Sequence, residues 1–374
     1  MKNLFIYGTL QCEALLRTVL GGDPEFRLIP AVLPGHGAFF AAGQRFPFIE
    51  PDVAQECAGL LAIGVSGEAL ERLTYYEGGF GYDLVQIEVQ TDTGPMTAEM
   101  WMTQPDRFDR GTRFDLADWQ AQHAAVSIRA AGEVMQWRGR KSAQEVAAIY
   151  PMIEMRAASF ILGSEEQVPD APSGLTRDDV KVVQHSYAYA EYFAVESYQL
   201  KYRRFDGDFS SEVHYSSLGA TDAALVLPYD PARDRVMLVE QFRMGAWTRG
   251  DRVPWQLEPI AGRVDSGETP ESTAMREAQE EAGIDLKGLE LISRGYPTPG
   301  CSNEYFYVYL GLADLPDSAA GMGGLAMENE DIRSHVMSFD EAMKMLEQGT
   351  IRILPLQMAL FWLATHRDRL RSGA

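Results

Sequence analysis

The alternation of hydrophobic and polar residues predicts that the N-terminal quarter of the chain is rich in strands. Short apolar runs recur there between Gly, Pro and Asp residues, the usual pattern of strands joined by turns. One helical stretch, residues 67–76, interrupts them and would place Glu77 at its C-terminal end, just before two glycines. The predicted strands are residues 4–7, 58–63, 83–89 and 97–103.

The pattern changes twice further along the chain. Residues 114–163 lack strand alternation and predict two or three helices, with Pro151 at a helix start or break. Residues 164–176 hold two prolines and several acids, which indicates a linker. Strands are then predicted at 180–183, 190–203, 223–228, 235–241 and 256–261, and helices from Ser338 to near Gly349 and over 356–370.

The strand at 256–261 leads into residues 262–284, where acidic residues are concentrated. Glu277, Glu280 and Glu281 stand at positions i, i+3 and i+4 and therefore share one helix face. Like charges at this spacing repel, so the face needs either open water or bound cations. Thr269 is the predicted N-cap, with Pro270 as first helical residue, and Gly283 ends the helix. We interpret the stretch as a metal-diphosphate site; a solvated acidic face is the alternative.

The same stretch resembles the box of the Nudix family, GX5EX7REUXEEXGU with U aliphatic. The resemblance implies a Nudix α/β/α sandwich over residues 178–374 and cleavage of a nucleoside diphosphate with two or three Mg²⁺ ions, Mn²⁺ being possible. Such ions prefer oxygen ligands. The implied metal ligands are Glu277, Glu280, Glu281, Glu330 and the carbonyl of Ala261. The box positions are Gly262, Glu268, Arg276, Glu277, Ala278, Glu280, Glu281, Gly283 and Ile284, of which Ala278 is smaller than usual.

Residues after the box resemble the ADP-ribose pyrophosphatase branch of this family, whose mark is a downstream proline, here Pro299. The acidic segment 328–332 follows a glycine-rich stretch, 321–324, which reads as a mobile loop that could act as a hinge. The resemblance implies Glu328 as general base and a catalytic share for Glu280.

The same resemblance implies roles for charged residues in and around the box. Arg243 would lie near the substrate phosphates, and Arg203 or Arg204 could serve similarly; surface ion pairs are the alternative. Arg276 would orient carboxylates, and Glu268 would tie the loop to the helix. Members of this branch are commonly dimers, which implies a homodimer through the second domain.

Near the N-terminus, the first strand leads into Tyr7, Gly8, Thr9 and Leu10. A glycine at such a strand end lets backbone N–H groups approach a carboxylate ligand. Together with residues 73–78, which end in Glu77 and a glycine, this loop resembles the γ-glutamylcyclotransferase-like (AIG2-like) family. The resemblance implies a small β-barrel-like fold, a substrate held by residues 7–10, and Glu77 as proton relay with a raised pKa. The family often has Arg where this chain has Asp83.

Composition narrows the classes of function. The 374 residues are too many for one ordinary domain, and 46% hydrophobic with 23% charged residues is a normal soluble composition. The net charge of -21 argues against nucleic acid as a partner, because such affinity depends on Lys and Arg. Three distant cysteines suggest neither a disulfide framework nor a zinc site, which fits the cytoplasm. The apolar run 4–7 is too short for the apolar region of a signal peptide, and 353–364 is too short and interrupted to span a membrane.

The chain is thus predicted to be an α/β (α+β) protein with a cyclotransferase-like domain at 1–105, a helical connector and linker at 106–177 and a Nudix domain at 178–374. The first hypothesis is hydrolysis of ADP-ribose to AMP and ribose 5-phosphate. The alternatives are another nucleoside-diphosphate-linked substrate, such as a nucleotide sugar, or a nucleotide-binding sensor. For the N-terminal domain they are a γ-glutamyl cyclotransferase or a non-catalytic module. The domain order resembles bacterial tellurite-resistance Nudix proteins.

Overall fold

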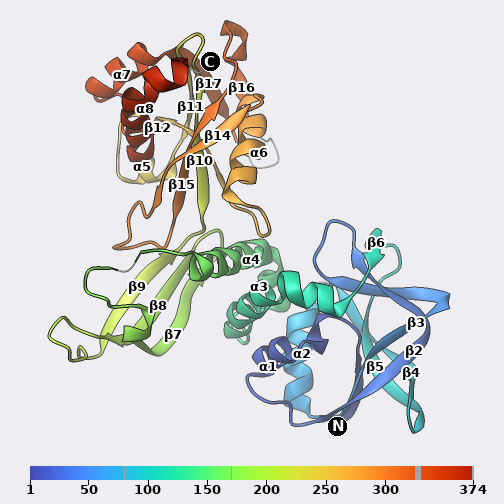
Figure 1. Ribbon diagram of the computed structural model, residues 1–374. Helices are drawn as coiled ribbons and strands as arrows, with labels where there is room; N and C mark the ends of the chain where they lie inside the picture. Colours follow the sequence, from blue (N-terminus) through green and yellow to red (C-terminus); the bar gives the residue numbers. More distant parts are fainter. Residues whose placement is uncertain (80, 170, 325–329, 373–374) are drawn as a thin grey trace. The chain divides into compact units, whose positions relative to one another are not determined.

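The computed structural model describes residues 1–79, 81–169, 171–324 and 330–372. The chain forms two compact units, Met1–Tyr215 and Ser216–Ala374 (Figure 1). Each unit has its own hydrophobic core. The two units are therefore described separately.

The first unit contains a closed barrel of five strands. The strands follow the order β3-β1-β5-β4-β2, and a further pairing of β2 with β3 closes the ring, while β6 pairs with β2. Phe5, Leu33, Leu61, Val89 and Met100, one from each barrel strand, form its apolar interior. The predicted barrel-like fold is thus confirmed. The strands are β1 (Lys2–Ile6), β2 (Arg27–Ala41), β3 (Pro47–Val65), β4 (Tyr82–Thr91), β5 (Gly94–Thr103) and β6 (Arg110–Arg113).

A second core in this unit lies among helices. Leu15, Leu73, Trp119 and Ile153, each from a different helix, are buried together. The predicted helix before Glu77 is confirmed as α2, with Ser66 as its N-cap. The helices are η1 (Thr9–Gln11), α1 (Glu13–Leu20), α2 (Gly67–Gly78), α3 (Leu116–Gln136) and α4 (Ala143–Glu165).

Three expectations for this unit were wrong. Helix α1 is a second helix within the barrel region, where only one was expected. Strand β2 went unnoticed because Pro30 and Pro34 interrupt its pattern, although both lie within the strand. Pro151 neither starts nor breaks a helix but lies inside α4, which continues on both sides of it.

Helix α4 also bears on the prediction of no membrane partner. It is long and apolar enough to span a membrane by length and composition alone. However, Val146, Ile149, Ile153 and Ala157 of α4 belong to the helical core, and the core helix of a soluble protein meets the same criterion. The absence of a membrane partner stays a prediction.

A three-stranded sheet in the order β7-β8-β9 follows the helices, with the unit boundary inside β9. Buried residues of the β7–β8 hairpin, Tyr187, Ala190 and Ala194, belong to the helical core, and Arg140, between α3 and α4, donates to the carbonyl of Tyr187 (2.7 Å). The sheet follows η2 (Arg177–Asp179) and consists of β7 (Val180–Ala190), β8 (Ala194–Tyr202) and β9 (Val213–Gly219). The predicted domain limits at 105, 177 and 178 stay predictions.

The second unit is a sheet with helices on both faces. The sheet has the order β14-β15-β10-β11-β17-β16, while β12 pairs with β11 and β13 pairs with β10. Figure 1 shows α6 on one side of the sheet and α7 and α8 on the other, which confirms the predicted α/β/α sandwich. The strands are β10 (Ala223–Asp230), β11 (Arg235–Phe242), β12 (Trp255–Glu258), β13 (Ile260–Arg263), β14 (Gly288–Gly295), β15 (Phe306–Leu312), β16 (Met322–Gly323) and β17 (Ile332–Ser338).

The helices of this unit match the predicted ends closely. Ser338 and Glu341 form the expected capping box of α7. On the face covered by α8, Leu356, Leu360 and Leu363 pack against the sheet. The helices are α5 (Met244–Thr248), α6 (Pro270–Ala282), η3 (Asp317–Ala319), α7 (Phe339–Glu347) and α8 (Leu354–Ser372).

Two expectations for this unit were wrong, and both concern segments beside α6. The single strand predicted at 256–261 is two strands, β12 and β13, which separate at Pro259 and pair with different neighbours. Residues 321–324 do not form only a loop, because Met322 and Gly323 form β16 and pair with β17. Both segments bring backbone close to the acidic helix.

The fold predicts where a truncated leucine is costly. Leu227 on β10 is fully buried in the core beneath α8, so Leu227→Ala should reduce the free energy of unfolding of the second unit by about 2–5 kcal/mol. Leu354→Ala is the matched control, because Leu354 is 71% exposed and its loss should change stability by less than about 0.5 kcal/mol. Hydrogen exchange in peptides from β10 and β15 measures this stability. Equal losses in both variants would contradict the assigned core.

Candidate functional site

Helix α6 begins and ends as its sequence predicts. The hydroxyl of Thr269 accepts a hydrogen bond from the N–H of Ser272 (3.2 Å), and the hydroxyl of Ser272 accepts one from the N–H of Thr269 (2.9 Å). Pro270 is the first helical residue, where its missing N–H costs nothing. Gly283 ends the helix in the left-handed conformation, with φ of 63°. These local signals fix which residues of α6 face the sheet.

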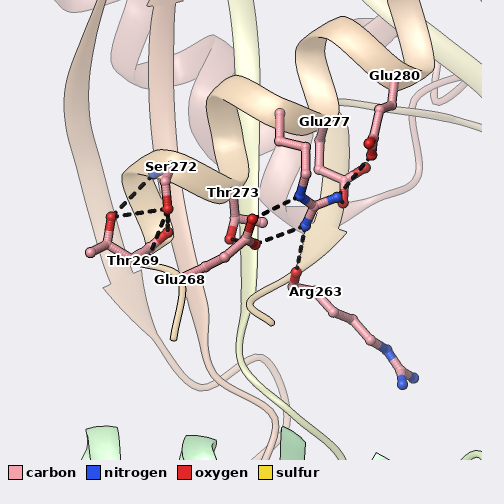
Figure 2. Close-up of polar contacts among 8 residues, drawn as sticks. Arg263, Glu268, Thr269, Ser272, Thr273, Glu277 and Glu280 are labelled. Atoms are coloured by element: carbon pink, nitrogen blue, oxygen red, sulfur yellow. Dashed lines mark hydrogen bonds and ion pairs between the residues drawn. The ribbon is translucent and has the colours of Figure 1, made fainter. Parts of the chain in front are cut away.

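Arg276 is the centre of a polar network on this helix. Figure 2 labels its partners Glu268, Glu277 and Glu280. Its guanidinium donates to both carboxylate oxygens of Glu268 (3.0 and 2.9 Å), to Glu277 (2.6 Å) and to Glu280 (2.8 Å). It also donates to the carbonyl of Arg263 on β13 (3.2 Å). The hydrogen bond to Glu268, followed by the charges of the other carboxylates, raises the pKa of Arg276. The predicted roles of Arg276, orienting carboxylates, and of Glu268, tying loop to helix, are confirmed.

Glu281 and Glu277 lie on the side of α6 that faces the sheet. Glu281 is only 2% exposed and accepts a hydrogen bond from the N–H of Ala261 (3.3 Å). Burial, with the charge of Glu277 added, raises the pKa of Glu281 to about 8. Burial also raises the pKa of Glu277 to about 7, against the opposing effect of Arg276. Near neutral pH Glu281 is therefore mostly protonated and Glu277 about half protonated, whereas a bound cation would favour the charged form of both.

Gly262 allows Glu277 to occupy its position. A Cβ atom at Gly262 would overlap the carboxylate of Glu277, so any other residue would displace either the strand or that side chain. The first glycine of the box is thus required by close contact between β13 and α6. Backbone proximity of this kind leaves the Glu277 carboxylate enclosed between strand and helix.

Glu330 approaches the same carboxylates from another segment. It lies between β16 and β17 in the sequence, and its charge contributes to the raised pKa of both Glu277 and Glu281. The structure therefore brings Glu330 close to the face of α6, as predicted. Glu328, the predicted general base, lies outside the described residues. The catalytic and metal-binding roles of Glu280, Glu281, Glu277 and Glu330 stay predictions.

The donor set suits a hard divalent cation. The carboxylates near Glu281, those of Glu277 and Glu330, are oxygen donors of the type that Mg²⁺ prefers. A nearby divalent charge would oppose the burial and the carboxylate repulsion that together raise the pKa of Glu277 and Glu281. In the described ranges, no three acidic, His or Cys side chains already converge as a ready-made metal site. Arg276 meanwhile occupies one oxygen each of Glu277 and Glu280.

The predicted substrate-binding residues occupy different surroundings. Arg243 donates from Nε to both oxygens of the buried Glu258 (2.9 Å each), and its charge lowers the pKa of Glu281. Arg203, in the first unit, forms an ion pair with Asp179 (2.6 Å). Pro299 is exposed in the turn closed by Cys301 and Thr298. Arg243 thus lies near the carboxylates of α6, and all three binding roles stay predictions.

Sequence reasoning gave no role to Glu304, although it lies in this neighbourhood. Burial raises its pKa, while the charges of Arg263 and Arg243 lower it. Glu304 is half-buried and directly precedes Tyr305 and β15. An acidic residue at the start of a strand was the sequence feature that could have indicated it. Its position places a third charged group near Arg243, besides Glu258 and Glu281.

The first unit contains a separate candidate site, a cavity of about 80 Å³. Tyr7, Gly8, Thr9 and Leu10 line it together with Glu77, so the two segments singled out in the sequence do meet. The other described lining residues received no site role from the sequence. Phe5, Ile6 and Tyr76 adjoin or belong to the two segments, whereas folding of the barrel and α4 brings in Phe46, Pro47, Tyr82, Trp101 and Tyr150.

The chemistry of this cavity is set by one acid among hydroxyl groups. Burial raises the pKa of Glu77 to about 7. Among the described lining residues none is positively charged, so backbone N–H groups and tyrosine hydroxyls are the donors at hand. The hydroxyl of Tyr82 already donates to the carbonyl of Pro47 (3.0 Å). Glu77 is thus able to accept and release a proton near neutral pH.

Comparisons with known proteins agree with this division. A sequence model described as NUDIX domain matches residues 219–357, and one described as gamma-glutamyl cyclotransferase, AIG2-like, matches residues 4–121. An ADP-ribose pyrophosphatase of Escherichia coli (strain K12) is 36% identical over 201 residues, covering 54% of this chain and 95% of its own length. One from Haemophilus influenzae is 36% identical over 200 residues, covering 53% and 92%. A GDP-mannose pyrophosphatase of Cronobacter sakazakii is 29% identical over 177 residues, covering 46% and 89%.

The raised pKa of Glu77 predicts how stability depends on pH. Because the pKa rises from 4.5 to about 7 on folding, the folded protein binds more protons than the unfolded chain between these values. Stability of the first unit should therefore fall as pH rises from 4.5 to 7. Glu77→Gln removes this dependence, so it should stabilise the unit at pH 8 by on the order of 2 kcal/mol and change little at pH 5.

The measurement is hydrogen exchange in barrel peptides at both pH values, corrected for the intrinsic pH dependence of exchange. Glu71→Gln is the control, because this acid on the same helix is 71% exposed and pairs only with Arg138. A gain at pH 8 no larger than that of the control would contradict the buried, proton-holding state of Glu77.

Proposed function

Because this chain belongs to the Nudix family, we propose that its second unit hydrolyses the diphosphate of ADP-ribose to AMP and ribose 5-phosphate in a Mg²⁺-dependent reaction. The observation that carries the proposal is the group of carboxylates on α6, held by Arg276 and enclosed by β13 at Gly262. The relatives named ADP-ribose pyrophosphatase, at 36% identity, support this substrate.

The side chains near α6 would have different roles in catalysis, according to their positions. Glu277, Glu280, Glu281, Glu330 and the carbonyl of Ala261 would hold Mg²⁺, or Mn²⁺, as two or three ions. When bound, such ions neutralise the diphosphate and make a water molecule a stronger nucleophile. Arg276 keeps Glu277 and Glu280 oriented, since it hydrogen-bonds both. Burial of Glu281 excludes water from its carboxylate and so strengthens its interaction with a cation.

The remaining roles concern the substrate and the attacking water. Arg243 would contact the phosphates, because its charge already acts on Glu281 while Glu258 fixes its guanidinium. Arg203 and Pro299 are further candidates for substrate contact. Glu328 would take the proton from the attacking water as general base.

A nucleotide sugar is the alternative substrate, supported by relatives named GDP-mannose pyrophosphatase at 29–30% identity. A panel of ADP-ribose and GDP-mannose with product analysis separates the two. A non-catalytic sensor is the alternative from another class. It is disfavoured because Glu277, Glu280 and Glu281 are all present.

For the first unit we propose a γ-glutamyl cyclotransferase, favoured by the cavity in which Glu77 meets residues 7–10. In this reaction the α-amino nitrogen attacks the γ-carbonyl carbon, the bond to the amine breaks, and 5-oxoproline forms. Glu77 would move the proton from the attacking nitrogen to the leaving amine, a task suited to a pKa of about 7. A binding or dimerisation module is the alternative. Asp83, where the family often has Arg, is not among the described lining residues.

Three broader expectations accompany these proposals. We propose a homodimer formed through the second unit and a cytoplasmic location. The link to tellurite resistance, which rested on domain order alone, stays a prediction.

The first test of the Nudix proposal is Glu281→Gln. Removing this buried charge should lower kcat for ADP-ribose by on the order of a thousandfold, because a cation would lose an enclosed ligand. Steady-state kinetics with product analysis measures the effect. Glu271→Gln is the control on the same helix, since Glu271 bonds the hydroxyl of Tyr309 (3.0 Å), away from the Arg276 network. Unchanged turnover in Glu281→Gln would overturn the metal assignment.

The test of the cyclotransferase proposal measures 5-oxoproline released from a panel of γ-glutamyl amines and peptides. Wild-type protein should release it, and Glu77→Gln should lower the rate by about a hundredfold or more because the proton relay is lost. Glu71→Gln on the same helix should keep the wild-type rate. If no compound in a broad panel yields 5-oxoproline, the non-catalytic module is the correct reading.

A further inference from the structure

The short strand β16 lies against the C-terminal end of the acidic helix α6. The N–H of Gly324 donates to the carbonyl of Glu280 (3.3 Å). A Cβ atom at Gly323 would overlap the carbonyl oxygen of Glu281. The backbone of β16 and of Gly324, which follows it, thus contacts the peptide groups of the two residues whose side chains are candidate metal ligands.

Gly324 lies close to a second segment, the one that carries Glu330. It has φ of +90°, a conformation that L-residues with a side chain rarely adopt. A Cβ atom there would meet Cβ of Glu330 at 2.8 Å and Cγ1 of Ile332 at 3.3 Å. Ile332 is fully buried and pairs with Gly323 across the β16–β17 ladder. A side chain added at position 324 would therefore meet Glu330 and the fixed side chain of Ile332.

The other end of β16 is held by hydrogen bonds. The N–H of Gly321 donates to the hydroxyl of the buried Ser334 (2.8 Å), and the N–H of Ser334 donates to the carbonyl of Gly321 (2.9 Å). In contrast to Gly323 and Gly324, Gly321 has open space where a Cβ would lie, and its φ is not positive. This segment thus contains two constrained glycines and one unconstrained glycine.

We propose that Gly323 and Gly324 are positioning residues of the Nudix centre, which fix the distance between Glu330 and the carboxylates of Glu277 and Glu281. The inference rests on the proposed function, because it concerns the same carboxylates. Glycine is required at both positions for packing against α6 and Glu330, not for flexibility. Adding one methyl group at either position moves β16 away from the helix and shifts Glu330 relative to its neighbours.

The test compares Gly323→Ala, Gly324→Ala and the control Gly321→Ala in the full-length protein. Binding of Mn²⁺ alone, followed by electron paramagnetic resonance of free Mn²⁺, reports on the centre without nucleotide. The first two variants should bind Mn²⁺ about tenfold more weakly and lose on the order of tenfold to a hundredfold in kcat for ADP-ribose. KM should change little because Arg243 is not displaced. Gly321→Ala should match wild type in all three quantities.

A second variant covers the case that the alanine substitutions prevent folding. Ser334→Ala removes only the hydroxyl that anchors β16, and it should weaken Mn²⁺ binding and kcat in the same direction but less. Wild-type Mn²⁺ affinity and kcat in folded Gly323→Ala and Gly324→Ala, or in Ser334→Ala when those variants do not fold, would overturn the proposal. Wild-type protein that binds Mn²⁺ but leaves ADP-ribose intact would overturn the proposed function instead, and the Mn²⁺ affinities would still decide the role of the glycines.

Discussion

Repulsion among the carboxylates of α6 is the constraint on which the second unit depends. Glu277, Glu280 and Glu281 share one face of a helix, and Glu330 adds a fourth carboxylate near two of them. Arg276 lies among them as a hydrogen-bonded cation and divides its donors between Glu277, Glu280 and Glu268. Glu281, in contrast, accepts a hydrogen bond from the backbone N–H of Ala261. The excess of negative over positive charge is least screened at the buried Glu281, where water is excluded. A divalent cation would therefore be attracted most strongly there.

Close backbone contact on two sides keeps this arrangement from relaxing. On one side β13 passes Glu277 at Gly262, and on the other β16 meets the carbonyl of Glu281 at Gly323. At each point a side chain would collide with α6 or Glu277, so glycine allows both β13 and β16 to pass close to the helix. The strands themselves are fixed by pairing with β10 and β17. The sheet therefore determines how closely the carboxylates are held together.

The sequence predicted those parts of this site that depend on contacts between residues close together in the chain. Thr269, Pro270 and Gly283 act within one helical turn of each end of α6, and Arg276 reaches Glu280 one turn away. Spacing alone gives such contacts. The splitting of β12 from β13, in contrast, depends on pairing with different strands, and β16 is too short to show periodicity. For the cavity, sequence identified residues 7–10 and Glu77, whereas Tyr82 and Tyr150 join them only because the barrel and helices fold together.

Both units raise the pKa of a glutamate toward neutrality by burial, yet their surroundings direct the two groups to different chemistry. The described neighbours of Glu77 in its cavity are neutral, mostly apolar side chains with several tyrosines, so no cation among them takes the place of the proton. The carboxylate then exchanges protons near pH 7, which suits acid–base work. Glu281 has Glu277 and Glu330 as neighbours. As more of these carboxyl groups ionise, their negative charges favour binding of a cation over binding of a single proton. A divalent ion satisfies several carboxylates at once, which one proton cannot do, and the same burial therefore favours proton transfer in one unit and metal binding in the other.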